Sequence, residues 1–115
     1  MEVTRMEELS SYQLHLHQPL QTNQVMKLYK LVSKSNQNVY VHQNHLIADS
    51  GHLPKLMSFF LLMDINEPLV MIIDGEEVEQ TFQEIESSWK DNIAEANCRR
   101  RYTDSIINSN SSIFV

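Results

Sequence analysis

Cysteine, glycine and proline are all scarce in this chain of 115 residues, which contains one, two and three of them. The single cysteine, Cys98, excludes an internal disulfide and is typical of a protein of the reducing cytoplasm. The apolar run at residues 59–63 is far too short to cross a bilayer, so we expect no membrane association. The first ten residues are acidic and have no apolar core, which argues against a signal peptide.

Positive charge is also in short supply, because 9 Lys and Arg face 15 Asp and Glu, for a formal net charge of −6. A nucleic-acid-binding protein needs a basic face to meet phosphates, so this balance argues against that class of function. The one basic cluster, residues 99–101, is interpreted as a solvated helix end. The length predicts one domain with a single core.

Apolar residues follow strand and helix periods in turn along the chain. Alternating patterns, or short β-branched runs, predict strands at residues 12–17, 39–42, 46–48 and 69–73. Apolar residues repeated every three or four positions predict helices that begin near Thr22, Leu53 and Val78, with Ser50 as a cap of the second. This β-α-β-β-α-β-α order predicts an α+β fold in which an antiparallel sheet carries the helices on one face.

Residues 12–60 resemble HPr, the small phosphocarrier of the bacterial sugar phosphotransferase system, and the resemblance extends to about Trp89. In that family a strand runs into the motif G-[LI]-H-A-R-P-A, which opens the first helix. Aligned without a gap, residues 19–25 here read PLQTNQV. The resemblance implies an open-faced sandwich over residues 11–90, with a four-stranded antiparallel sheet and three helices on one face. Residues 1–10 are then an N-terminal arm, and residues 91–115 a helical extension with a flexible tail.

The same alignment places Gln21 at the position of the phosphorylated histidine and Asn23 at the position of the arginine. A carboxamide nitrogen is a poor phosphoryl acceptor, because its lone pair is delocalised into the carbonyl group. Gln24 replaces the proline of the motif. Loss of both acceptor and anion ligand predicts a non-catalytic protein without a cofactor.

Two histidines leave alternatives open. His17, in the sequence LHQP, resembles a shortened active-site motif, and an active phosphocarrier using His17 is the first alternative. An alignment that makes His17 the reactive histidine requires about four extra residues before the first helix. Helix boundaries predicted from one sequence carry errors of a few residues, so this alignment stays open. His52 occupies the position at which some relatives carry a regulatory serine, and Ser50 precedes it by two residues.

The expected function is therefore binding to other proteins. Leu20, Leu53 and Met57 match positions that relatives use to dock partners, and Phe60 is expected to join them. The resemblance implies phosphotransferase system enzymes or a transcription regulator as partners, and a regulatory role.

The predicted sheet offers a second apolar surface, because Val70 and Ile72 should point away from the core. Contiguous exposed apolar area often marks an interface, so a homodimer through the open sheet face is a further interpretation. A degenerate structural or metal-binding protein is the last alternative, since His15, His17 and His42 lie on predicted strands. Zinc needs a third close ligand. In the sheet order that the resemblance implies, the fourth strand lies between the first two and separates His15 from His42, so we expect exposed strand histidines and no metal.

Overall fold

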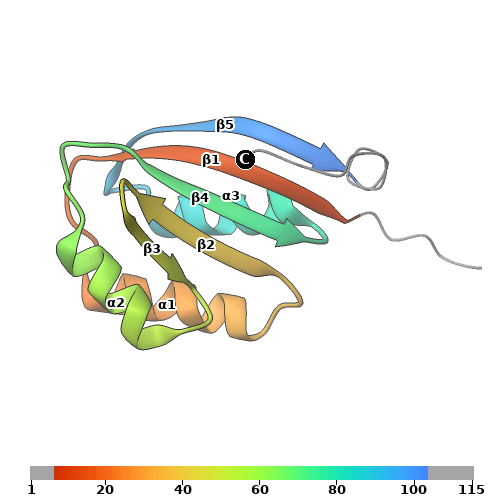
Figure 1. Ribbon diagram of the computed structural model, residues 1–115, viewed down its shortest axis with the longest axis horizontal. Coiled ribbons are helices and arrows are strands. Elements are labelled where there is room, and N and C mark those ends of the chain that lie inside the picture. The colour runs from red at the N-terminus through yellow and green to blue at the C-terminus, as the bar shows by residue number, and fades with distance from the viewer. Residues whose placement is uncertain (1–6, 104–115) are drawn as a thin grey trace, which may run out of the picture.

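The computed structural model describes residues 7–103, in which three helices cover one face of a five-stranded antiparallel sheet (Figure 1). The strands are β1 (Glu8–Leu16), β2 (Asn38–Gln43), β3 (Leu46–Asp49), β4 (Leu69–Gly75) and β5 (Ile93–Thr103). The helices are α1 (Thr22–Ser33), α2 (Leu53–Leu62) and α3 (Val78–Ser88). None of these helices is both long and apolar enough to span a membrane. The predicted α+β class is confirmed.

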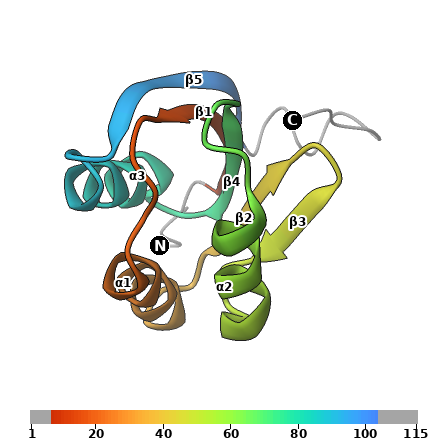
Figure 2. The ribbon, with the colours of Figure 1, turned by 90° about the vertical axis from the view of Figure 1, so that its left-hand side faces the viewer.

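The strands lie in the order β3-β2-β4-β1-β5, so β4 is central and separates β1 from β2, as expected (Figure 2). The sheet has five strands, however, and the expectation of four was wrong. β5 occupies the stretch that was expected to extend the third helix, and it places residues 99–101 on a strand instead. The free edge of β1 supplies backbone partners for this stretch over nine register positions, which a local helical pattern cannot reveal.

The chain ends also differ from the expected boundaries. β1 begins at Glu8, so the last residues of the expected arm belong to the sheet. Residues 1–6 of that arm lie outside the described residues, as does the part of the expected C-terminal extension from residue 104 onward, which contains the expected flexible tail.

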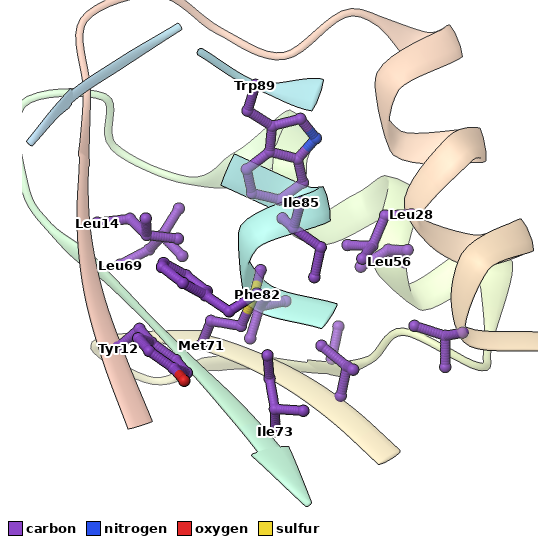
Figure 3. Close-up of a cluster of buried hydrophobic side chains, with 14 of the residues drawn as sticks. Tyr12, Leu14, Leu28, Leu56, Leu69, Met71, Ile73, Phe82, Ile85 and Trp89 are labelled. Carbon is purple, nitrogen blue, oxygen red and sulfur yellow. The ribbon is translucent and has the colours of Figure 1, made fainter. Parts of the chain in front are cut away.

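The core lies between the sheet and the helices (Figure 3). Leu69, Met71 and Ile73 of β4 are fully buried, while Val70 and Ile72 face the other way and are half-buried, as predicted. The ring of Tyr12 in β1 stacks on that of Phe82 in α3, with centroids 3.7 Å apart and planes 3° from parallel.

In α2 the buried side chains are Leu56 and Phe59. The helical spacing of apolar residues had predicted a core stripe of Leu53, Leu56, Met57 and Phe60, with Phe59 and Leu62 off it. The prediction for Phe59 was wrong, because its side chain is only 2% exposed. Met57 and Phe60, which the expected stripe included, are half-buried. The helix is thus rotated so that its core face is centred on Leu56 and Phe59.

Two glutamines hold the connections beside the sheet. Gln43 is buried, and its Nε2 donates to the carbonyl oxygens of Asp64 (2.8 Å) and Glu67 (3.0 Å) while its Oε1 accepts from the Asp64 N–H (2.7 Å). Gln37 donates to the carbonyl of Glu76 and packs against Gly75, where an added Cβ would lie 2.9 Å from its Cγ. With φ at +143°, Gly75 has a backbone conformation that suits glycine alone.

Candidate functional site

The start of α1 presents Gln21 to solvent. The helix begins at Thr22, as predicted, with Gln21 as its N-cap residue in an extended conformation. The Gln21 N–H donates to Oε1 of Gln24 at 2.8 Å, and both Gln21 and Asn23 are exposed. The two positions that the resemblance assigns to phosphate chemistry are therefore accessible, but both carry neutral carboxamides.

Gln24 joins the start of α1 to the turn between α3 and β5. Its Nε2 donates to Oδ1 of Asn92 at 2.8 Å, and Nδ2 of Asn92 donates to the carbonyl of Pro19 at 2.9 Å. The N–H of His17 donates to the carbonyl of Asn92 at 2.8 Å. Asn92 is only 5% exposed, so these bonds lie largely out of water. The residue at the motif's proline position thus serves as a structural tether.

The buried role of Asn92 was not predicted from the sequence. Asn92 stands between the exposed Asp91 and the half-buried Ile93, at the junction of two elements. The sequence contains no periodic pattern that predicts burial of a polar residue at such a junction. Asn92 is buried because the start of α1 packs against it.

His17 directly follows the last residue of β1 and is exposed. Its backbone is held beside the α3–β5 turn, with three residues between it and the N-cap of α1. The structure therefore keeps this imidazole at a strand end rather than at the first turn of the helix, where free N–H groups favour an anion.

His52 caps α2, a role that the sequence had assigned to Ser50. Nδ1 of His52 faces the Lys55 N–H at 3.4 Å, and the His52 backbone has the extended conformation of an N-cap residue. Ser50 is completely buried, so its hydroxyl is closed to a modifying enzyme in the folded protein. His52 itself is exposed.

A groove of about 480 Å³ lies between the start of α1 and α2, and we call it the α1–α2 groove. Three of the four predicted partner-binding residues, Leu20, Met57 and Phe60, line it. Leu53 does not line it, although it is half-buried on the first turn of the same helix. The complete lining is Pro19, Leu20, Thr22, Val25, Met57, Ser58, Phe60 and Leu61, none of which carries a charge.

Leu61, which lines this groove, is 83% exposed, and Leu62, the next residue of α2, is 66% exposed. Leu62 was expected to lie off the core stripe, which is confirmed, whereas Leu61 was missed. The signal is present in the sequence, because the five apolar residues at 59–63 exceed what one face of a helix can bury. Leu61 and the rest of the groove lining form an uncharged and largely apolar surface.

The open face of the sheet carries a more mixed surface. Val70 and Ile72 are half-buried at its centre, and Ile47 of β3 is 68% exposed. Burial lowers the pKa of His42 on this face, and the positive charge of Arg99 lowers it further. Nδ1 of His15 lies 3.6 Å from Oε2 of Glu95.

The histidines of the sheet are not gathered into a metal site. Across the described part of the chain, no group of three or more His, Cys, Asp or Glu side chains is arranged to hold a metal ion. His15 lies on β1 and His42 on β2, and β4 runs between these strands.

A scan of the chain against protein-family models gave no match, and a comparison with curated proteins likewise gave none. Membership of the HPr family therefore stays a prediction from the sequence pattern.

Proposed function

We propose that this protein is a non-phosphorylatable, HPr-like binding module of the cytoplasm that docks a partner protein on the α1–α2 groove. The observation that carries the proposal is the convergence of Leu20, Met57 and Phe60 on one uncharged groove, which the exposed Leu61 also lines. The partners implied by the resemblance are enzymes of the sugar phosphotransferase system or a transcription regulator, which would make the role regulatory.

The apolar surface supports a docking role on energetic grounds. Removing a leucine side chain from water contributes roughly 1.5–3 kcal/mol, and Leu61 and Leu62 are both largely exposed. Methionine, which is unbranched and has three rotatable bonds, adapts its shape to a partner more easily than branched side chains do. A central cluster of this kind supplies most of the energy in many interfaces.

The neutral start of α1 supports binding without phosphoryl transfer. Gln21 offers no nucleophilic nitrogen, Asn23 offers no positive charge, and Gln24 is engaged with Asn92. Incubation with the upstream phosphotransfer enzyme and phosphoenolpyruvate should leave the protein unmodified. A phosphohistidine mapped to His17 would instead establish the active phosphocarrier.

The docking surface is tested by calorimetric titration of the upstream phosphotransfer enzyme into wild type and variants. Leu61→Asp and Met57→Asp should each weaken binding at least about tenfold, since one buried, unpaired charge costs more than 1.4 kcal/mol. Ile47→Asp is the matched control, because Ile47 is also largely exposed but lies on β3. Equal affinity of all three variants and wild type would place the docking surface elsewhere.

A further inference from the structure

A second furrow runs between α1 and α3, and it differs in charge from the α1–α2 groove. It has a volume of about 330 Å³ and a floor that includes the buried side chains Leu28, Ile85 and Trp89. α1 makes closer contact with α2 than with α3, which leaves the floor open along this side. Figure 3 shows Ile85 pointing from α3 toward Leu28 of α1, below the indole of Trp89. The remaining lining residues are Lys27, Lys30, Leu31, Lys34, Glu84 and Ser88.

One rim of this α1–α3 furrow is cationic. Lys27, Lys30 and Lys34 are all exposed and follow one another at i, i+3 and i+7, which places them along one side of the helix. The sequence of α1 contains no acidic residue. Three ion pairs have both members within residues 7–103, namely His15–Glu95, Arg101–Glu8 and Arg101–Glu79, and none of them involves Lys27, Lys30 or Lys34.

Like charges at these spacings repel one another, and an anionic partner would relieve that repulsion. In a chain whose net charge is −6, such a stripe is a local departure from the overall sign. The opposite rim, on α3, contributes only Glu84 and Ser88.

We propose that the α1–α3 furrow binds an amphipathic helix of another protein whose polar flank is acidic. The apolar side chains of that helix would lie against Leu28, Leu31 and Ile85, in the way amphipathic helices dock in apolar grooves elsewhere. Its carboxylates would meet the three lysines, which extend over about 10 Å, or roughly two turns, from Lys27 within α1 to its C-cap residue Lys34. Beyond Lys34 the hollow that continues the furrow is lined by Glu76 and Glu77, so the acidic stretch must end there.

Fluorescence anisotropy with two labelled peptides of about 18 residues, or five helical turns, tests the proposal on the full chain. Both peptides carry leucines at one helical face; one has glutamates along the flank and the other has lysines. The glutamate peptide should bind at least about tenfold more tightly, and its affinity should fall at about 1 M salt, where screening acts over about 3 Å. Equal binding of the two peptides would overturn the proposal, as would equal binding of a scrambled glutamate peptide.

A triple variant, Lys27→Glu with Lys30→Glu and Lys34→Glu, should bind the glutamate peptide at least about tenfold more weakly than wild type does, and should no longer prefer it over the lysine peptide. The side chains are exposed, so circular dichroism should show an unchanged fold. Lys55→Glu on α2 is the matched control and should leave binding within about twofold. Backbone amide shifts caused by the peptide should fall in α1 and α3; shifts confined to α2 would overturn the assignment. Anionic vesicles that bind with the same dependence on the three lysines would assign the stripe to a lipid surface instead.

Discussion

The bond between Gln24 and Asn92 gives the most direct test of how the start of α1 is held. Replacing Asn92 with alanine removes its hydrogen bonds to Gln24 Nε2 (2.8 Å) and the Pro19 carbonyl (2.9 Å). The backbone bonds of residue 92 to Trp89 and His17 stay possible. The change is therefore confined to one side-chain amide that is almost wholly buried.

We expect Asn92→Ala to lower the free energy of unfolding by about 2 kcal/mol, since each buried neutral hydrogen bond contributes roughly 1 kcal/mol. The Ser88 carbonyl, 3.5 Å from Gln24 Nε2, can compensate only weakly for the lost partner. Gln24→Ala loses the same bond to Asn92, for about 1 kcal/mol, and in addition the exposed bond that Gln24 Oε1 accepts from the Gln21 N–H. Because the two residues share a bond, the double variant should be more stable than the sum of the single effects predicts, by about 1 kcal/mol.

Urea unfolding followed by the fluorescence of Trp89, the only tryptophan, measures these values. The slope of the free energy of unfolding against urea concentration should be unchanged. An unchanged slope means that the variants differ in stability and not in the compactness of either state. Asn97→Ala is the control, because Asn97 is exposed on β5 and should change stability by less than about 0.5 kcal/mol. Strict additivity of Gln24→Ala and Asn92→Ala would refute the tether.

Two further predictions concern the sheet. Gln43→Ala should cost about 3 kcal/mol, because three short hydrogen bonds to Asp64 and Glu67 are lost, and amide exchange at residues 64–68 should accelerate. Asn38→Ala, at an exposed position on the same strand, is its control, and unchanged exchange at residues 64–68 in Gln43→Ala would contradict the prediction. For His42, burial and then Arg99 lower the pKa below its ordinary value of 6.5, so its contribution to stability is complete above that pH and is lost as the pH falls through the folded pKa. His42→Gln should remove this part of the loss of stability at acid pH, and His45→Gln should not. An NMR titration of Arg99→Gln should show a higher pKa for His42 than in wild type. An unchanged pKa would show that Arg99 does not act on the imidazole.

Local periodicity was enough for most of the fold. The alternation along β1 and β2, the short apolar run of β4 and the helical stripes of α1 and α3 each predict one element, so the α+β class follows from residue order. The start of α1 at Thr22 could also be predicted from the sequence, because Pro19 interrupts the strand pattern and apolar side chains then recur at helical spacing. The orientation of α2 did not follow, because residues 59–63 are apolar on every side.

The candidate sites divide in the same way. Leu20, Met57 and Phe60 were expected together, and the α1–α2 groove does bring them together. The α1–α3 furrow was not expected, since its floor joins residues that are more than fifty positions apart, such as Leu28 and Ile85. Asn92 was missed for the same reason, because its partners Gln24 and Pro19 lie 68 and 73 positions earlier in the chain.

The sequence by itself determined that Gln21 and Asn23 are neutral, that the chain is acidic, and which side chains alternate between core and solvent. These properties depend on residue identity and on neighbours within a few positions. Only the tertiary structure decided that residues 93–103 form a fifth strand, because a strand is selected by the free edge of β1. It likewise decided that Gln24 is a tether and that three lysines border an apolar furrow, since both depend on how α1 and α3 lie across the sheet.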